Sequence, residues 1–492
     1  MIRKICLLMM LAGLSMHYAQ ALPDPSQDKR VQEVYDYLQG QLIWTKDGQW
    51  TLCGKTLLDT LSHVDQDGLW QENYTPIIEA LQKADLTSPE GSKEVDELLT
   101  LGALNYISDM KGERLNLHAS AKEIYLKQGV VDETEDLKKY LSIPDQCGWI
   151  HGLAPTTPEY QHLKTLLSSY RQKQALGGWP QLPKGTKLER GDQGPHVQTL
   201  RAQLIVQDAL PSQEQGSDVF DEELEGAVKN YQKLHGLEPD GKVGSSTLAA
   251  LNTTVDDRIR SIIVNLERQR WYPSTLPARY IQVNIPGFYL KAVDEGKPAF
   301  FMRIITGKEH TKTPVFNALL PEVIFNPAWH VPASIARDLL PKIEANPRAY
   351  AAKGYRINER KIVQSPGREN SLGKIRFTID SPYGIYLHGT PQQSLFNKAN
   401  RAYSHGCIRV QDPEKLAAFV FNDPEVWSAA RIKKETSGSN TKHVKLNAPL
   451  PVFITYFTVF EDENHQIHFV GDEYDQDKKI WHAFEGLRVK GE

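Results

Sequence analysis

The sequence predicts a multidomain α+β protein in which a mostly helical N-terminal part precedes a β-rich C-terminal domain. The chain has 492 residues, more than one hydrophobic core usually holds, since domains run to ~100–200 residues. Residues 22–180 place apolar side chains at helical spacing, as at Leu57 and Leu61. From about residue 279 the pattern changes to period two, because Ile281 and Val283 alternate with polar residues as in a half-buried strand.

The N-terminus has the order of features that is typical of a secretory signal peptide. Two basic residues, Arg3 and Lys4, precede an apolar run over residues 5–14, and Ala19-Gln20-Ala21 then supplies a small-x-small cleavage pattern. No other stretch approaches the ~20 apolar residues that a membrane helix needs. We therefore expect residues 1–21 to be a signal peptide and the rest of the chain to be exported without a further transmembrane segment.

Charge and cysteine content exclude two classes of protein. The 57 Lys and Arg residues against 61 Asp and Glu residues give a net charge of −4, which supplies no basic field for nucleic acid. Four cysteines in a chain of this length do not build a disulfide scaffold. Cleavage after residue 21 leaves Cys53, Cys147 and Cys407. Cys53 and Cys147 either pair or remain buried thiols, and Cys407 is the candidate for a free reactive sulfur.

Two regions precede the β-rich domain. Residues 22–180 are predicted to form a helical scaffold domain that shows no catalytic constellation and ends at a Gly- and Pro-rich linker. Residues 186–252 are predicted to form a three-helix module. In that module Asp221 is the expected cap of the second helix, and Ser245 or Ser246 the expected cap of the third.

The predicted β-rich domain covers residues 279–475 and contains an insertion. Three strand patterns joined by tight turns open the domain, at residues 281–285, 288–293 and 299–306. Residues 326–368 become helical again, with one helix that is expected to stop near Pro341 and a second that opens at Asn346-Pro347. Further on, Asp412-Pro413 is expected to start a helix with Asp412 as its cap. A helical insertion just ahead of candidate chemistry indicates a lid over the site.

A cysteine and a histidine lie near each other in this domain. Alternation over residues 385–388 places Tyr386 and His388 on one face of a strand. Cys407 follows His388 by 19 residues, a gap that one strand and one returning loop close easily. A thiol of reference pKa ~8.5 needs a base or a positive group to become nucleophilic at neutral pH. We expect His388 to be that base.

Neighbouring residues suggest the remaining roles at this site. Gly406 allows close approach of the backbone to a carbonyl, so the amides of Gly406 and Cys407 are expected to form an oxyanion hole. His405 orients the loop or contributes a donor. Arg409 shares a face with Cys407 if the segment is extended, and its guanidinium suits bidentate binding of a carboxylate. No metal or cofactor is expected, because His465-x-x-His468 lacks acidic or thiol partners at ligand spacing.

These segments resemble two known families. His388, fifteen intervening residues and Ser404-His405-Gly406-Cys407 are similar to the YkuD-type catalytic domain of the L,D-transpeptidases. Residues 186–252 resemble the peptidoglycan-binding type 1 module through His235-Gly236-Leu237 and Asp240-Gly241-x-Val243-Gly244. The likeness extends to the large multidomain branch of the family, with further matches at Asn265-Leu266-Glu267-Arg268-x-Arg270-Trp271, Gly307-Lys308 with Thr313-Pro314, Asn326-Pro327-x-Trp329 and Gln364-x-Pro366-Gly367.

The resemblance implies an enzyme of the periplasm of a Gram-negative-type cell envelope. By that resemblance Cys407 attacks the third residue of a peptidoglycan stem peptide, releases the terminal D-amino acid and forms a thioester. The amine of a second stem peptide then resolves the thioester into a 3→3 cross-link, and carbapenems acylate the same cysteine. Stem peptides and glycan are the expected partners, and other cell-wall synthesis proteins are further candidates.

The resemblance also suggests substrate contacts. These are Tyr386, Gly389, Ser404, Arg409, Asn326 and Trp329, although Trp329 is equally well explained by packing inside the lid. Two other functions stay open. The same cysteine and histidine serve an L,D-carboxypeptidase or cross-link hydrolase if water is the acceptor. A non-catalytic peptidoglycan-binding protein needs only the scaffold and the module.

Overall fold

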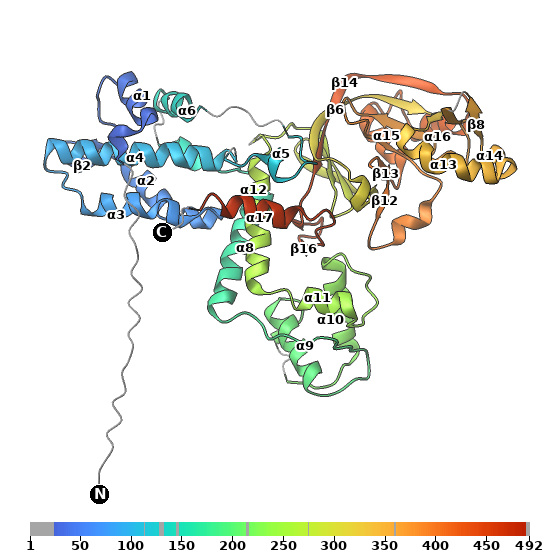
Figure 1. The fold of residues 1–492 in the computed structure, drawn as a ribbon, viewed down its shortest axis with the longest axis horizontal. Helices are drawn as coiled ribbons and strands as arrows, with labels where there is room; N and C mark the ends of the chain where they lie inside the picture. Colours follow the sequence, from blue (N-terminus) through green and yellow to red (C-terminus); the bar gives the residue numbers. More distant parts are fainter. Residues whose placement is uncertain are drawn as a thin grey trace, which may run out of the picture.

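The computed structural model describes residues 24–488, except 113, 127–131, 144–146, 213–215, 274 and 359–360. The expected signal peptide, residues 1–21, lies outside the described residues. The architecture confirms the predicted α+β class, with a helical N-terminal region, a small helical module and a β-rich domain (Figure 1). Within the described part of the chain, no helix combines the length and apolar character needed to cross a membrane.

The N-terminal region is organised around one long helix, α4 (Pro89–Met110). Asp96 of α4 is fully buried, and its carboxylate accepts hydrogen bonds from the backbone N–H groups of Ile43 (2.9 Å), Trp44 (2.8 Å) and Thr45 (2.8 Å). A buried charge is tolerated when it is fully hydrogen-bonded, and here it fixes the segment before β2. The other elements are η1 (Pro25–Gln27), α1 (Lys29–Tyr37), β1 (Thr45–Lys46), β2 (Gln49–Trp50), α2 (Leu52–Leu61), η2 (Val64–Asp67), η3 (Gln71–Asn73), α3 (Thr75–Lys83), α5 (Leu117–Ser120), α6 (Glu133–Leu141), α7 (Gly148–Gly152) and α8 (Pro158–Ala175).

A disulfide joins Cys53 of α2 to Cys147, which directly precedes α7. Their Cα atoms are 5.0 Å apart and the two residues are 94 positions apart in the sequence. The pairing that the sequence left open is therefore present. In the described part of the chain Cys407 is the cysteine that remains outside a disulfide.

The three-helix module consists of α9 (Pro195–Val206), α10 (Glu222–Leu234) and α11 (Ser245–Leu251), with a hydrophobic core of its own. The Asp221 carboxylate accepts the Leu224 N–H (2.9 Å), which confirms the predicted cap of α10. The predicted serine cap of α11 is wrong. Gly244 occupies the capping position there, and Ser245 is already the first helical residue.

Helix α12 (Val255–Arg270) contacts all three parts of the chain. Arg258 donates to the Ala250 carbonyl of the module (3.0 Å). Arg270 pairs with Glu267 (2.7 Å) and donates to the Tyr160 hydroxyl of α8 (3.1 Å). Arg268 pairs with Asp477 (2.5 Å) of the C-terminal helix α17 (Gln476–Glu485). These partners explain how α12 can be buried although it carries charges, because each buried cation has an acceptor close by.

The β-rich domain is a nine-stranded sheet of order β12-β5-β13-β11-β10-β6-β14-β3-β4. Strand β5 pairs with β4 through residues 297–303 and with β13 through residues 304–305, so the sheet curls round and closes. The three strands predicted over the start of the domain correspond to β3, β4 and β5. The strands are β3 (Tyr280–Asn284), β4 (Tyr289–Asp294), β5 (Lys297–Gly307), β6 (Phe316–Phe325), β10 (Ile375–Thr378), β11 (Tyr386–His388), β12 (Ala402–Ser404), β13 (Ile408–Val410) and β14 (Lys442–Thr455).

Short helices and a hairpin complete this domain. Asp412 caps α15 by accepting the Lys415 N–H (2.9 Å), as the Asp-Pro pair predicts. Leu416 and Val420 of α15 are buried in the main hydrophobic core, to which the inward face of the sheet also contributes. The elements are η5 (Glu309–Thr311), η6 (Gln393–Asn397), α15 (Pro413–Phe421), α16 (Ala429–Ser437), β15 (Val459–Glu461) and β16 (Ile467–Phe469).

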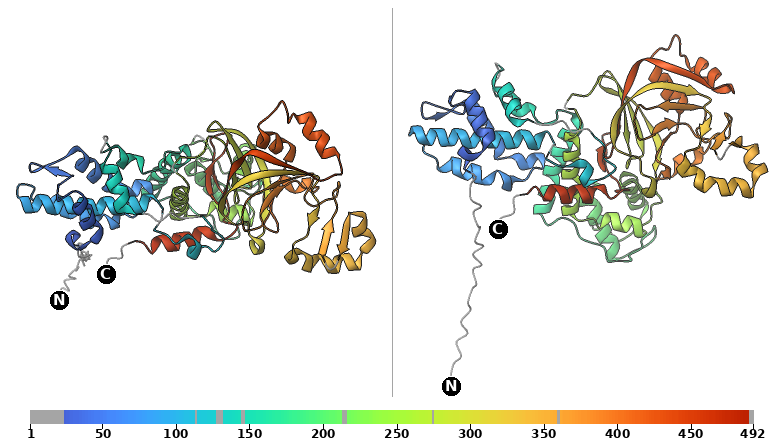
Figure 2. Two further views of the ribbon diagram at one scale, coloured as in Figure 1. Left: turned by 90° about the horizontal axis from the view of Figure 1, so that it is seen from above. Right: turned by 45° about the horizontal axis from the view of Figure 1, so that its top comes forward.

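The predicted insertion projects from the end of the β-rich domain that lies away from the scaffold (Figure 2). Its two helices are present, although α13 runs through Pro341, where the sequence predicted a stop. Besides the helices it holds a three-stranded sheet of order β7-β9-β8, which the sequence analysis missed. We call this insertion the lid, and its elements are β7 (Trp329–His330), α13 (Ala333–Ala345), α14 (Pro347–Ala352), β8 (Tyr355–Asn358) and β9 (Lys361–Gln364).

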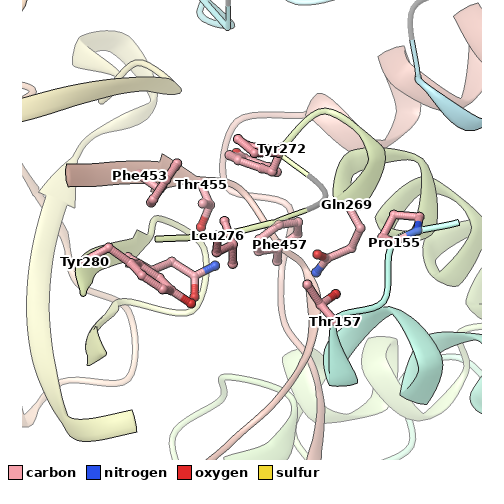
Figure 3. Close-up of a pocket in the computed structure, with 11 residues that line it drawn as sticks. Pro155, Thr157, Gln269, Tyr272, Leu276, Tyr280, Phe453, Thr455 and Phe457 are labelled. Carbon is pink, nitrogen blue, oxygen red and sulfur yellow. The ribbon is translucent and has the colours of Figure 1, made fainter. Parts of the chain in front are cut away.

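A small cavity lies where α12 leads into the sheet, between Tyr272, Tyr280 and Phe453 (Figure 3). Its volume is about 30 Å³, enough for one or two water molecules and too small for a substrate. Gln269 and Thr455 supply polar groups at its wall (Figure 3). We interpret it as a packing gap between domains.

Removal of the disulfide is expected to destabilise the N-terminal region. A cross-link that closes a loop of 94 residues restricts the unfolded chain, so a variant with Cys53→Ala and Cys147→Ala should lose about 2–4 kcal/mol of unfolding free energy. Thermal unfolding followed by circular dichroism measures the change. Dithiothreitol should lower the melting temperature of the parent chain and leave that of the double variant unchanged. An equal response of the two chains to reductant would contradict the assignment.

Candidate active site

Cys407 lies in the short loop that joins β12 to β13, and its thiol is half-buried. Strands β11 and β13 are parallel, with Leu387 opposite Ile408 and His388 opposite Arg409. Leu387 and Ile408 are fully buried on the inner face of the sheet. Because side chains alternate along a strand, Tyr386, His388, Cys407 and Arg409 project together from the other face, which we call the site face.

The Cys407 thiol is surrounded by Tyr386 and by the carbonyl of Gly384, to which it donates at 3.8 Å. Burial raises the pKa of the thiol above its ordinary value. Hydrogen bonds from the backbone N–H and the hydroxyl of Tyr386, and the positive charges of Arg376 and Arg409, act in the opposite direction. With a raised pKa the thiol keeps its proton near pH 7, so it needs a base to become nucleophilic.

Tyr386 connects the thiol to the lid. Burial, and next the charge of Cys407, raise the pKa of the Tyr386 phenol, and the indole of Trp329 in β7 acts in the opposite direction. The guanidinium of Arg376 lies 4.3 Å from the centre of the Tyr386 ring. Trp329 therefore lies at the junction of lid and site face.

His388 is 5 % exposed. It lies on the site face opposite Arg409, which is two residues after Cys407. Its Nδ1 is 2.6 Å from the Gly389 carbonyl oxygen, which only accepts, so Nδ1 carries the proton and Nε2 carries the lone pair. Burial, and next the charge of Arg409, lower the pKa of His388 to about 3. Hydrogen bonds with the backbone of Gly389 and Leu372 act in the opposite direction. At neutral pH the imidazole is therefore a neutral group.

Gly389 has a different role from the predicted substrate contact. It is buried, its N–H donates to the Ile375 carbonyl (2.9 Å), and its own carbonyl orients His388. A Cβ on the neighbouring Gly373 would lie 2.6 Å from the Gly389 carbonyl carbon, so two glycine backbones meet there. We therefore assign Gly389 to positioning the imidazole.

Ser404 holds the backbone of the loop between β12 and β13, residues 405–407, which we call the catalytic loop. The Ser404 hydroxyl accepts the Gly406 N–H (3.0 Å) and donates to the Cys407 carbonyl (2.5 Å). This bonding corrects two expectations. The Gly406 amide is already engaged and is not a free oxyanion donor, and Ser404, 2 % exposed, supports the loop and does not face a substrate. Gly406 has φ +111°, which explains why glycine is needed at that position.

A second segment, residues 307–313, also holds the loop through hydrogen bonds. The Thr313 hydroxyl accepts the Gly307 N–H (2.9 Å) and donates to the Gly406 carbonyl (2.8 Å). The Thr311 hydroxyl donates to the Ser404 carbonyl (2.9 Å). Lys312, between them, pairs with Glu123 of the N-terminal region (2.9 Å). These supports were missed as site residues, because their contacts with the loop and with the N-terminal region join positions at least 93 residues apart.

Two cations lie on the site face. Arg409, predicted to bind a carboxylate, donates to the Gln392 side chain (2.7 Å). Arg376 lies on β10 directly opposite His388 and was missed. The signal for it was present, because Arg376 and Thr378 alternate with the fully buried Ile375 and Phe377, a pattern that puts Arg376 on the open face of its strand.

His405 and the lid interact through charge. His405 is exposed, and its pKa is lowered by partial burial and by the charges of Lys308 and Arg409. Asp338 of α13 acts in the opposite direction, and Lys342 of α13 adds to the lowering. Helix α13 of the lid is thus within electrostatic reach of the catalytic loop.

Asn326 does not reach the site face. It is 2 % exposed with φ +47°, and its amide group donates to the backbone carbonyls of Glu435 (2.8 Å) and Asn440 (3.4 Å). Its own carbonyl accepts the Thr441 hydroxyl (2.8 Å). We correct its role from substrate contact to stabilisation of the turn that ends β6.

Three family models match the chain. One, the L,D-transpeptidase catalytic domain, matches residues 278–426, the segment that contains the whole site face and the lid. Residues 278–426 are therefore similar to the catalytic domain of the L,D-transpeptidases. The other two matches are a scaffold domain over residues 29–167 and a "Putative peptidoglycan binding domain" over residues 193–251. The combination agrees with the multidomain branch that the sequence motifs resemble.

A curated relative and solved structures are similar to parts of the chain. A Haemophilus influenzae protein named "Putative L,D-transpeptidase" is 31 % identical over 243 residues, which cover 45 % of this chain and 49 % of the relative. The chain thus spans about half the length of that relative. An L,D-transpeptidase structure from Xylanimonas cellulosilytica aligns at 17 % identity over 56 % of this chain and 98 % of its own, with TM-score 0.19. One from Mycobacterium smegmatis aligns at 14 % identity over 36 % and 58 %, with TM-score 0.22.

His465 and His468, which the sequence analysis considered as metal ligands, have carboxylate neighbours that it missed. His465 contacts Glu461 (2.5 Å), and His468 contacts Asp462 (3.0 Å). Throughout the described residues, no group of three or more His, Cys, Asp or Glu side chains is arranged to hold a metal ion.

Loss of the Tyr386 hydroxyl should make the thiol harder to ionise. In Tyr386→Phe the hydrogen bond that favours the Cys407 thiolate is absent, so its pKa rises further and alkylation below that pKa slows by roughly threefold to tenfold. Rates of iodoacetamide labelling between pH 6 and 10, followed by mass spectrometry, test this. Tyr383→Phe, on an exposed neighbouring tyrosine, is the matched control. Identical pH profiles for the two variants would refute the contact.

Thr313 is expected to contribute to both stability and loop geometry. Thr313→Val preserves shape but leaves the Gly307 N–H and the Gly406 carbonyl without their partner, at a cost of about 1–3 kcal/mol in unfolding free energy. Urea denaturation measures the loss. Thr199→Val on the exposed face of α9 should change stability by less than about 0.5 kcal/mol. A Thr313 variant as stable as the Thr199 variant would remove Thr313 from the support of the loop.

Proposed function

We propose that this chain is a periplasmic L,D-transpeptidase that forms 3→3 cross-links in peptidoglycan through a thioester on Cys407. The arrangement of the site face carries the proposal. A thiol, a neutral imidazole and two guanidinium groups project together from adjacent strands. The L,D-transpeptidase domain and the peptidoglycan-binding match support the reaction and the polymer.

In the first step Cys407 Sγ attacks the carbonyl carbon of the third stem residue. The thiol proton passes to Nε2 of His388 as the carbon–sulfur bond forms, because burial disfavours a free thiolate. The peptide C–N bond then breaks, and the proton moves from His388 to the departing D-amino acid. A histidine whose pKa is about 3 is a strong acid once protonated, which suits donation to that leaving group. Arg376 and Arg409 attract the terminal carboxylate.

In the second step the side-chain amine of another stem peptide attacks the thioester. Nε2 of His388 accepts the proton of the amine, the carbon–sulfur bond breaks, and the Cys407 sulfur recovers a proton as the new amide forms. Water competes with the amine at this stage. The lid opposes that competition, since Trp329 reaches from β7 to Tyr386 beside the sulfur.

The disulfide supports the proposed compartment. Disulfides persist in oxidising environments such as the periplasm and are rare in the cytosol. The Cys53–Cys147 bond therefore agrees with export directed by residues 1–21.

Incubation of the chain lacking residues 1–21 with disaccharide-tetrapeptide tests the function. Mass spectrometry should show a cross-linked dimer and released D-amino acid, and Cys407→Ala should abolish both products. His388→Asn should slow dimer formation at least about a hundredfold, in the range of a general base. Carbapenem should add its mass to the parent chain and not to Cys407→Ala.

Each alternative has its own outcome in this assay. Tripeptide without dimer identifies a hydrolase that uses the same residues, and unchanged substrate identifies a binding protein. Dimer formation by Cys407→Ala at the parent rate would overturn the mechanism. Near-ultraviolet circular dichroism of each variant establishes that loss of activity reflects chemistry and not unfolding.

A further inference from the structure

Residues 381–385, in the connection between β10 and β11, contact the catalytic loop at two points. The Gly384 carbonyl accepts the hydrogen of the Cys407 thiol at 3.8 Å. The Ile385 side chain packs against the backbone of Gly406, since a Cβ added there would lie 3.3 Å from Ile385 Cδ1. The position of the 381–385 loop therefore bears directly on how the nucleophilic sulfur is oriented and covered.

An aromatic ring ties this loop to its surroundings. The Tyr383 ring contacts that of Tyr125, with centres 4.3 Å apart, and that of Phe316, with centres 5.1 Å apart. Phe316 is buried at the start of β6, whereas Tyr125 and Tyr383 are 38 % and 36 % exposed. The Tyr383 N–H donates to the Ser381 hydroxyl (3.3 Å), a bond that stays within the loop. The two ring contacts thus connect the tip of the loop to other segments.

Tyr125 comes from the N-terminal region, and its backbone is fixed against the β-rich domain. Its N–H donates to the Val315 carbonyl (2.8 Å), and the Val315 N–H donates to the Glu123 carbonyl (2.9 Å). Ile124 and Val315 form a parallel bridge and are both buried. Figure 1 places α5, which ends just before this segment, at the junction of the two regions. A well-anchored part of the scaffold therefore supplies one of the two rings that Tyr383 contacts.

The loop affects the charge state of the sulfur as well as its position. A carbonyl oxygen can accept a hydrogen bond from the thiol but not from the thiolate, so the Gly384 contact favours the protonated form. Contact with the loop also adds to the burial of Cys407, and burial raises the pKa of the thiol. Release of the loop would therefore make the sulfur easier to ionise and easier to reach, and would leave it less well oriented.

We infer that Tyr125 is a positioning residue for Cys407, which acts from the scaffold through the Tyr383 ring and the Gly384 carbonyl. Tyr125 acts on the loop and not on the sulfur itself. The inference rests on the proposed function for the reaction that is served, whereas the series of contacts involves no substrate. It gives the scaffold, where the sequence analysis found no catalytic constellation, a part in setting the state of the nucleophile.

Iodoacetamide labelling of the full chain between pH 6 and 10 tests the inference without substrate. In Tyr125→Ala the pKa of the Cys407 thiol should fall, and alkylation below that pKa should be faster by roughly threefold to tenfold, as the loss of one aromatic pair allows. Tyr125→Phe keeps the ring and should restore the parent profile. Tyr37→Ala, which removes an exposed tyrosine of α1, is the matched control. Thermal unfolding of each variant distinguishes release of the loop from loss of the fold.

Tyr383→Ala removes the other ring of the same contact. Because both substitutions release one loop through one contact, the double variant should be alkylated no faster than the faster single variant. Dimer formation from disaccharide-tetrapeptide should change in the opposite direction and become slower in Tyr125→Ala. Alkylation needs only access to the sulfur, whereas peptide transfer needs a defined direction of attack.

Three results would overturn the inference. The first is a Tyr125→Ala labelling profile equal to that of Tyr37→Ala, and the second is an effect that Tyr125→Phe reproduces. The third is a pair of single effects that multiply in the double variant, since independent effects do not pass through one contact.

The two proposals fail separately. If labelling follows the expected pattern but the parent chain forms no dimer, the transpeptidase proposal fails and the positioning role of Tyr125 stands. If the parent chain forms dimer and Tyr125→Ala forms it at the same rate, the positioning role fails and the reaction stands.

Discussion

The structure depends on the need to neutralise the charges buried along α12. Arg258, Arg268 and Arg270 are each at most 7 % exposed, and a buried cation is stable only with close acceptors. The acceptors come from different parts of the chain: Ala250 in the module, Asp477 in the C-terminal helix and Tyr160 in the scaffold. Docking of each part is thus a condition for burying the helix. The relative placement of the three parts therefore depends on the hydrogen bonds of Arg258 and Arg270 and on the Arg268–Asp477 ion pair.

Contacts with distant parts of the chain also hold the catalytic loop. Lys312 pairs with Glu123 of the N-terminal region, and the neighbouring Thr313 donates to the Gly406 carbonyl. The segment over residues 307–313 thus links the catalytic loop to the scaffold. On the opposite side, Asn400, which precedes β12, donates to the Glu473 carboxylate. Cys407 therefore follows a strand that is tied to the C-terminal part of the chain and lies in a loop that is tied to the N-terminal region. Such restraint suits the proposed reaction, in which two strands of one polymer meet, because orientation of both partners lowers the entropic part of the barrier.

Sequence patterns predicted the features that depend on local periodicity. Alternation over residues 385–388 correctly placed Tyr386 and His388 on one face, and the Asp-Pro pair correctly started α15. The patterns failed where a role depends on distant partners. Ser404 and Gly389 lie beside the key residues in sequence, yet their polar atoms are used within the protein. The lid sheet was missed because β7 has only two residues and pairs with a strand more than thirty positions away. The burial of His388 and Cys407, which shifts the pKa of both side chains, could likewise not be predicted from the sequence.

The disulfide has a consequence for the chemistry as well as for stability. The proposed removal of residues 1–21 would leave three cysteines, and oxidative folding of three thiols permits three different pairings. Formation of the Cys53–Cys147 bond consumes the two partners that Cys407 has within its own chain. The bond therefore acts as a safeguard for the nucleophile, because an intramolecular thiol is no longer available to trap it. In an oxidising compartment, correct pairing in a domain far from the active site decides whether the enzyme keeps its reactive sulfur in the reduced form.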